Sequence, residues 1–537
     1  MQQMKMALPE NIENAKDVVY ATNITVAGQE FPIQLDTGSS DLWFKTPFDI
    51  PFTETTNISV DLKFGIGQAS GHIARAPVSL GPYHVENQAI MKAENTTDFG
   101  AIFNNGIFGI LGLAFDQSSN VFLESLLTFG RNDTSGRTFL GNIFAQNKQA
   151  PNMFAVTLGR KDDPEGDDDG VFTIGEYDPE FQDVASQPKL DRTPAQLHNL
   201  TTQPRWSVQM DKMVVNGQEF QFNQSCVSEA APGKTVMVLD TGFTFSQFPP
   251  AAVDFIYGSI PGAVKNETSG IWTVPCDCTT KLEFFFGGQS YLVHPLDISV
   301  VKNVNGQAVC QSTFRNLNIP PEAAGSDIGF DGILGVPFLK NVYTSFDFGD
   351  ITDDGTLGVP FVQMLTTTPS LDEALTEFRS TRPKQVASIQ QSASTSTASA
   401  GSLDLDDPGL NSIKFDTFKS EVPLQRRGRM LFTTATREST SIMPVRFRFR
   451  FGLPVHRIIA NASQTMRHCA HRVAKSRPVV IALLFGSLVI ALASILIGTI
   501  LLARYYWRNR QSQEEGYYEP IFVVKEEEEE EYDSVYV

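Results

Sequence analysis

FPIQLDTGSSDLWF, residues 31–44, places Asp-Thr-Gly directly after a run of apolar residues. VMVLDTGFTFSQF, residues 236–248, repeats that arrangement further along the chain. One given tripeptide is expected by chance only about 0.1 times in a chain of this length and ordinary composition. Two copies that both follow strand-like runs therefore indicate that one structural unit occurs twice.

Two aspartates brought together by such a duplication would have a defined chemistry. Two carboxylates about 3 Å apart cannot both ionise, so they share one proton and titrate as a coupled pair. The ionised member can take a proton from water, and the protonated member can polarise a substrate carbonyl. The glycine after each Asp-Thr permits a close backbone approach. Asp36 and Asp240 are therefore candidate catalytic residues for amide hydrolysis without a covalent intermediate.

A second repeated motif supports the duplication. Gly-Ile-Leu-Gly occurs at residues 109–112, after the first Asp-Thr-Gly, and at residues 332–335, after the second. A single copy would indicate only a buried strand that ends in a turn. Its recurrence in the same order favours two related halves.

The surrounding sequence predicts an all-β fold. From about residue 17 to residue 365, short apolar runs alternate with Gly, Pro, Asn and Asp, which is typical of strands joined by turns. Helices are predicted only at residues 121–129 and 251–260. The chain has 537 residues, which favours more than one domain.

Residues 17–365 resemble the pepsin-like aspartic proteases, particularly fungal members. The resemblance is carried by residues 36–40, by residues 240–242, by Leu42-Trp43, by the Cys276 context at residues 274–277, and by residues 338–347. It implies a bilobal fold of two orthogonally packed β-barrel-like lobes, residues 17–190 and 191–365. The active site would lie between the lobes, with the Asp pair at its floor.

The resemblance also assigns roles to individual residues. It implies a monomeric aspartic endopeptidase that cleaves peptide or protein substrates with apolar side chains at the scissile bond, with no metal or other cofactor. A disulfide would join Cys276 and Cys310. Active-site support is assigned to Thr37, Gly38, Ser39, Thr241, Gly242 and Thr244, and the substrate cleft and flap to Trp43, Phe64, Gly65, Ile66, Gly67 and Phe243.

Two positions depart from the family pattern. Phe64 stands where the flap of such enzymes carries Tyr, so the hydroxyl that would bond the Trp43 N–H is lost. Phe243 stands where Ser or Thr would orient the second catalytic carboxylate, and a lost hydrogen bond to a charged group costs about 1.5–3 kcal/mol. These changes keep a second hypothesis open, a catalytically impaired pepsin-like protein that binds peptides or mediates adhesion at the cell surface.

The rest of the chain predicts a membrane anchor. We expect a disordered Ser/Thr-rich stalk at residues 366–440 and a basic juxtamembrane segment at residues 441–478. Residues 479–503 carry no charge and are long enough to form a transmembrane helix. An acidic cytoplasmic tail follows at residues 504–537. Residues 1–16 contain no apolar signal core, which we interpret as a missing signal and propeptide; the alternative is a tail-anchored cytosolic protein.

Composition favours secretion and excludes some partners. The net charge of −19 argues against nucleic acid and suits work at acidic pH. Asn-X-Ser/Thr sequons precede the apolar segment, which predicts a single-pass type I glycoprotein with an extracellular or luminal catalytic domain. The 5 cysteines have no zinc-site spacing. Whether Cys226 pairs with Cys278 stays open. The sequons lie at Asn23, Asn57, Asn95, Asn132, Asn199, Asn223, Asn266 and Asn461.

Overall fold

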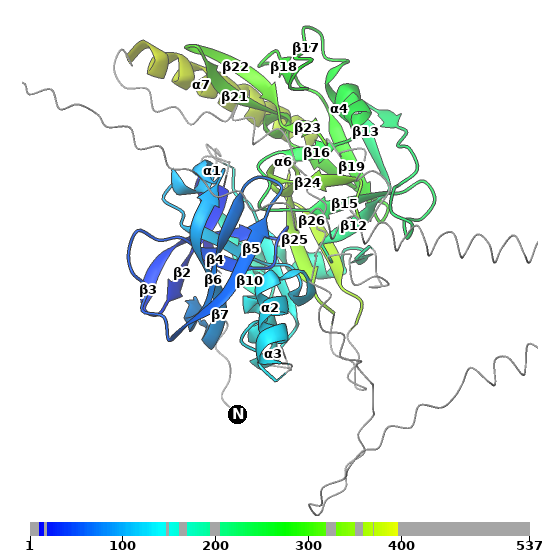
Figure 1. The fold of residues 1–537 in the computed structure, drawn as a ribbon. Helices are drawn as coiled ribbons and strands as arrows, with labels where there is room; N and C mark the ends of the chain where they lie inside the picture. The colour runs from blue at the N-terminus through cyan, green and yellow to red at the C-terminus, as the bar shows by residue number, and fades with distance from the viewer. Residues whose placement is uncertain are drawn as a thin grey trace, which may run out of the picture. The chain divides into compact units, whose positions relative to one another are not determined.

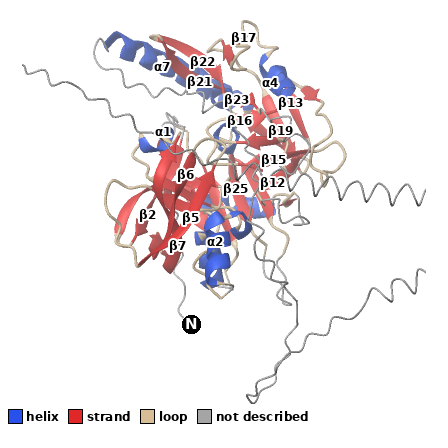
Figure 2. Cartoon of the chain, in the orientation of Figure 1, coloured by secondary structure: helices blue, strands red, loops and turns tan. Residues whose placement is uncertain are grey.

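The computed structural model describes a mostly β chain (Figures 1 and 2). The described residues all belong to the compact unit Met1–Arg426. They are 10–15, 19–130, 132–146, 150–160, 169–193, 204–317, 329–349, 358–368 and 370–395.

The largest sheet has 13 strands and includes strands from both ends of the described chain. β1 begins at Glu10 and pairs with β2 and β10, so the prediction that the fold starts at residue 17 was wrong. In spatial order the strands are β11 (Leu190–Asp191), β26 (Phe361–Thr366), β25 (Val342–Asp347), β9 (Met153–Thr157), β10 (Gly170–Ile174), β1 (Glu10–Ala15), β2 (Val19–Val26), β3 (Gln29–Asp36), β8 (Gly109–Gly112), β4 (Leu42–Phe44), β7 (Tyr83–Thr97), β6 (Gln68–Leu80) and β5 (Glu54–Lys63).

Strands between Ser207 and Leu334 form three smaller sheets in the described structure. A five-stranded sheet has the order β12 (Ser207–Met210), β15 (Thr235–Leu239), β24 (Gly332–Leu334), β16 (Ser246–Phe248) and β23 (Phe314–Asn316). A four-stranded sheet has the order β14 (Gln218–Phe220), β13 (Lys212–Val215), β19 (Leu282–Phe286) and β20 (Gln289–Val293). Another has the order β17 (Val264–Lys265), β18 (Trp272–Val274), β22 (Gln307–Ser312) and β21 (Ser299–Val304).

The duplicated motifs occupy matching places in two sheets. β3, which ends in Asp36, pairs in parallel with β8, and β15, which ends just before Asp240, pairs in parallel with β24. A Cβ added to Gly112 would lie 2.4 Å from the Ser40 carbonyl carbon, and one added to Gly335 would lie 2.3 Å from the Phe243 carbonyl oxygen. Each Gly-Ile-Leu-Gly therefore ends in glycine because the chain beyond an Asp-Thr-Gly passes against it.

Both predicted helices are present. α2 (Asn120–Phe129) begins where the Ser119 hydroxyl accepts the Phe122 N–H, and it ends at Gly130, whose φ is 83°. α4 (Pro250–Tyr257) begins with proline, which suits a first turn. The sequence did not predict α1 (Gly100–Phe103), α3 (Phe139–Gln146), α5 (Pro295–Ile298), α6 (Val336–Leu339), α7 (Leu371–Thr395), or the 3-10 helices η1 (Asp116–Ser118) and η2 (Pro179–Ser186).

The predicted stalk at residues 366–440 was wrong over its first part, because α7 occupies residues 371–395 and contacts α5, β21 and β22 (Figure 1). The Ser370 hydroxyl and N–H both donate to the Glu373 carboxylate at the start of the helix. Ala374 and Phe378, four residues apart, are buried on one face. The helix is therefore held by packing that its Ser-rich composition conceals.

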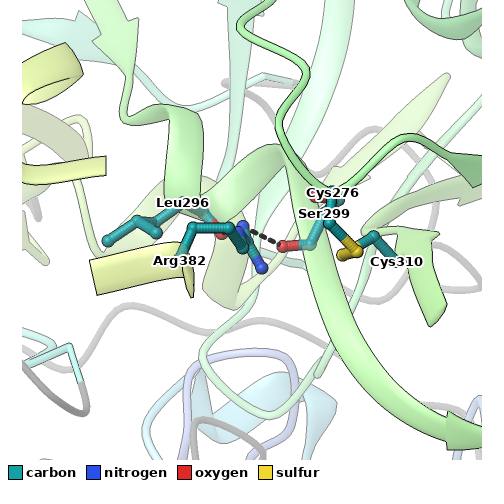
Figure 3. The surroundings of a disulfide bond; sticks show 5 residues. All are labelled: Cys276, Leu296, Ser299, Cys310 and Arg382. Carbon is teal, nitrogen blue, oxygen red and sulfur yellow. Dashed lines mark hydrogen bonds between the residues drawn. A yellow bond between two sulfur atoms is a disulfide. The ribbon is translucent and has the colours of Figure 1, made fainter. Parts of the chain in front are cut away.

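Arg382 fixes α7 to the body of the protein. Its side chain is buried, and Nη2 donates to the carbonyls of Leu296 at 2.9 Å and Ser299 at 2.8 Å. Figure 3 shows Arg382 beside the disulfide between Cys276 and Cys310. The predicted disulfide is confirmed, with Cα atoms 5.2 Å apart.

The anchor segments are not part of the described structure. Residues 441–478, 479–503 and 504–537 lie outside the described residues, as do Asn199 and Asn461. Within the ranges given above, no helix is both long enough and apolar enough to cross a membrane.

Candidate active site

The fold brings Asp36 and Asp240 together. The two carboxyl groups are buried and close enough that each acts on the pKa of the other. A Cβ added to Gly38 would lie 2.1 Å from Asp240 Oδ2, and one added to Gly242 would lie 2.4 Å from Asp36 Oδ1. Each glycine thus lies against the opposite carboxylate, at a separation that no larger residue would allow.

Two threonines hold the Asp-Thr-Gly turns in a reciprocal arrangement. The Thr37 N–H donates to Thr241 Oγ1 at 3.0 Å, and the Thr241 N–H donates to Thr37 Oγ1 at 3.0 Å. The Thr37 hydroxyl donates to the Leu239 carbonyl and the Thr241 hydroxyl to the Leu35 carbonyl, both at 2.8 Å. Both threonines are buried, so this network fixes the two turns relative to each other.

The two carboxylates have different surroundings. Asp36 accepts the Gly38 N–H at 2.8 Å and the Ser39 hydroxyl at 2.5 Å, while Asp240 accepts the Gly242 N–H at 2.9 Å. Burial raises the pKa of Asp36, and the Ser39 and Gly38 donors oppose that rise. Burial, followed by the charge of Asp36, holds the pKa of Asp240 well above its usual range. These surroundings favour the ionised form more at Asp36 than at Asp240.

Phe243, which replaces a hydroxyl-bearing residue of the family pattern, packs against an apolar cluster that includes Val236, Phe330 and Ile333. Its side chain and that of Thr244 are half-buried. The position thus contributes packing to the second Asp-Thr-Gly turn, and its side chain has no hydroxyl to offer Asp240.

The predicted flap is the hairpin between β5 and β6. Its turn closes with the Phe64 N–H donating to the Gly67 carbonyl at 3.0 Å, and Gly67 has a φ of 86° that favours glycine. Residues 64–67, which include Gly65 and Ile66, are all half-buried. The Phe64 ring lies 5.9 Å from the Trp43 ring and 5.5 Å from the Phe99 ring. Trp43 is fully buried, and its indole Nε1 has no hydrogen-bond partner among the residues that the structure describes.

Phe64→Tyr is expected to raise kcat/KM about fivefold, because one hydrogen bond to the unpaired Trp43 N–H contributes about 1 kcal/mol net. Peptide cleavage should be measured for both chains and again in a Trp43→Phe background, where that N–H is missing. A gain of equal size in the Trp43→Phe background would show that the hydroxyl acts elsewhere.

Arg205 is a residue near the site that the sequence reasoning missed. Its Nη1 donates to the Gly38 carbonyl at 3.2 Å, and its charge acts on both Asp36 and Asp240. A lone arginine outside the repeated motifs gives no sequence signal. The only available hint was its position directly before Trp206, a residue that a duplicated β fold would bury.

The two remaining cysteines of the described chain do not pair with each other. Cys226 is exposed and Cys278 is half-buried, and both are free. Over the described ranges, no cluster of three or more His, Cys, Asp or Glu side chains is placed to hold a metal ion.

Comparison with known proteins identifies similar chains. The family model "Eukaryotic aspartyl protease" matches residues 51–352, a span that contains Asp240 and begins after Asp36. A probable aspartic-type endopeptidase of Aspergillus fumigatus is 26% identical over 368 residues, covering 62% of this chain and 77% of that protein. Cathepsin E of Mus musculus is 27% identical over 363 residues, covering 64% of this chain and 80% of that protein. An aspartic proteinase from Irpex lacteus aligns with a TM-score of 0.48 at 20% identity, covering 67% of this chain and 98% of that one.

Proposed function

Because this chain belongs to the eukaryotic aspartyl protease family and is an aspartic endopeptidase, we propose that Asp36 and Asp240 are its catalytic pair. The observation that carries this proposal is the close approach of two buried carboxyl groups, each held by its own Asp-Thr-Gly turn and each lying against the glycine of the other turn. Thr37, Gly38, Thr241 and Gly242 act as support, because they fix the separation of the carboxylates.

The asymmetry of the pair assigns the proton transfers. Asp36, ionised and stabilised by Ser39, takes a proton from the attacking water. Asp240, protonated, donates a hydrogen bond to the carbonyl oxygen of the scissile amide and stabilises the charge that develops there. The proton taken up by Asp36 then passes to the leaving amine, and the pair returns to sharing one proton. Activity is highest at acidic pH, where Asp240 holds its proton.

Substrate binds in a cleft between two lobes whose boundary lies near residue 190. Phe64, with Trp43 buried against it, and Phe243 give that cleft apolar surface, which favours apolar side chains at the scissile bond. The hairpin at residues 63–68 closes over the peptide as a flap. The arrangement needs no metal or organic cofactor.

A second candidate function is peptide binding without cleavage, favoured by Phe64 and Phe243. Incubating the full chain with an unstructured protein across acidic and neutral pH separates the two. An endopeptidase produces internal cleavages that disappear in an Asp36→Asn variant. Saturable binding of peptides by folded protein, with no cleavage at any pH, would favour the alternative.

Phe243→Thr is expected to raise kcat about fivefold, because a hydroxyl that hydrogen-bonds and orients the protonated Asp240 carboxyl contributes about 1 kcal/mol net. Phe243→Val is the matched control, since valine has the shape of threonine and no hydroxyl. Both variants should lose similar stability in urea. An equal kcat for the two variants would contradict a role for the missing hydroxyl.

The chain is further proposed to be a single-pass type I membrane glycoprotein anchored by residues 479–503. The sequon asparagines of the described structure are exposed, namely Asn23, Asn57, Asn95, Asn132, Asn223 and Asn266. Deleting residues 479–503 should move the enzyme from the membrane fraction to the medium, and a glycosidase should reduce its apparent mass. A chain that stays unglycosylated in the cytosol would contradict this topology.

A further inference from the structure

Arg205 is held at a fixed place beside the Asp36–Asp240 pair. The neighbouring Trp206 is fully buried, and its indole N–H donates to the Leu113 carbonyl at 3.1 Å. The Ser118 hydroxyl donates to the Pro204 carbonyl at 2.7 Å. The backbone on both sides of Arg205 is therefore tied to the segment that follows the first Gly-Ile-Leu-Gly motif.

The side chain of Arg205 uses little of its hydrogen-bonding capacity. A guanidinium has five N–H donors in a planar fork. In the part of the chain that the structure describes, the Gly38 carbonyl accepts one of them at 3.2 Å, and no carboxylate forms an ion pair with the rest. The guanidinium lies 5.8 Å from the centre of the Phe330 ring. Arg205 as a whole is half-buried, so part of the residue meets solvent.

The catalytic pair supplies the anionic charge that acts on the guanidinium. The ionisable groups that act on the guanidinium are Asp36 and Asp240, which share one proton and hence one negative charge. That charge is spread over two carboxyl groups held by their own turns. Arginine stays protonated in such surroundings, and its fork matches a carboxylate in a bidentate geometry.

We propose that Arg205 is a specificity residue that selects substrates with an acidic side chain, Glu or Asp, beside Gly38 and close to the scissile bond. This inference rests on the proposed function of the Asp36–Asp240 pair. The half-buried Phe64 and Phe243 offer apolar surface only, so the preferred peptide combines apolar residues with one carboxylate. A neutral side chain at that place would cover the guanidinium without replacing the water it displaces.

The test compares peptides that differ only in charge. Fluorogenic peptides carry Glu or Gln, in turn, at each position flanking the scissile bond, and the full chain is assayed beside its Arg205→Met and Arg205→Lys variants. At one position, kcat/KM for Glu should exceed that for Gln by about tenfold, as expected for a charge-assisted bond. That ratio should fall toward one below about pH 4, where the peptide Glu is protonated. In Arg205→Met the Glu-to-Gln ratio of kcat/KM should fall to about one, and in Arg205→Lys part of the preference for Glu should remain.

Arg379→Met is the matched control, since Arg379 is an exposed arginine on α7 and the Glu preference should persist in that variant. If Arg205→Met lowers cleavage of the Glu and Gln peptides equally, Arg205 only positions the Gly38 turn and the specificity proposal is wrong. If the wild-type chain cuts neither peptide, the proposed catalysis fails separately. Fluorescence anisotropy with the same peptides then decides: tighter Glu binding that Arg205→Met removes supports the proposal, and equal affinities overturn it.

Discussion

Replacing Asp240 with Asn is expected to reduce peptide hydrolysis about 10,000-fold, because the substitution removes a proton-transferring group from the pair. An asparagine keeps the shape of the side chain and can still accept the Gly242 N–H that Asp240 accepts at 2.9 Å. What it loses is the proton that polarises the substrate carbonyl and is shared with Asp36. The measurement is kcat/KM for one peptide at several pH values, with urea unfolding as the check on folding.

The wild-type pH profile should be bell-shaped. Activity is lost at low pH when Asp36 becomes protonated and at higher pH when Asp240, whose pKa lies well above its usual range, loses its proton. Asp254→Asn is a suitable control, since Asp254 lies on α4 and pairs with Lys265 at 2.7 Å. Residual Asp240→Asn activity within about tenfold of wild type would exclude general acid–base catalysis by the pair.

Replacing Asp297 with Asn is expected to destabilise the protein by about 3–5 kcal/mol, the usual cost of removing one member of a buried ion pair. Asp297 is buried on α5, where it accepts hydrogen bonds from Arg160 Nη2 at 2.7 Å and Asn341 Nδ2 at 3.0 Å. Lys340 Nζ lies 2.7 Å from its other oxygen. Because Arg160 follows β9 and Lys340 follows α6, one carboxylate links three segments that are far apart in sequence.

The stability lost in the Asp297→Asn variant should depend on pH. Burial alone would raise the pKa of Asp297, but the charges of Arg160 and Lys340 hold it well below its usual range. A folded-state pKa below the unfolded value of about 4 adds stability above that pH, and this stability disappears as the pH falls toward the folded value. The difference in unfolding free energy between wild type and Asp297→Asn should therefore be full near neutral pH and shrink below about pH 4.

Urea unfolding, followed by tryptophan fluorescence near neutral pH and again below about pH 4, would measure this difference. The matched control is Glu219→Gln, which removes an exposed ion pair with Lys212 of 3.4 Å and should cost less than about 1 kcal/mol. A cost that is the same at both pH values would mean that packing, rather than charge, accounts for the role of Asp297.

Local sequence patterns predicted many of the strands, turns and helices of this fold. The repeated Asp-Thr-Gly and Gly-Ile-Leu-Gly motifs predicted a duplicated β fold, because a strand followed by a tight glycine turn is specified by neighbouring residues. The same reasoning identified α2 and α4, while the flap hairpin between β5 and β6 was placed by family resemblance. Resemblance to the pepsin-like family supplied the pairing of Cys276 with Cys310.

The segment that became α7 shows where composition misleads. Ser, Thr and Gln dominate its second half, which is typical of a disordered stalk. The residues that face the body of the protein include Ala374, Phe378 and Arg382, spaced four residues apart. The carbonyls that Arg382 meets, those of Leu296 and Ser299, are far away in sequence. The helix is stabilised by packing against the surface around these carbonyls. Because the surface is created by the tertiary fold, it cannot be read from the sequence of the helix itself.

The sequence by itself determined the two Asp-Thr-Gly turns and the strands that precede them, since each depends on residues a few positions apart. Tertiary structure alone decided that burial raises the pKa of both aspartates and that the Ser39 hydroxyl opposes this rise at Asp36, because these effects act through space. It also decided that Arg205 reaches Gly38, 167 residues away in sequence, and that Asp297 meets Arg160. Electrostatic energies depend on distance and on exclusion of water, and chain folding sets both.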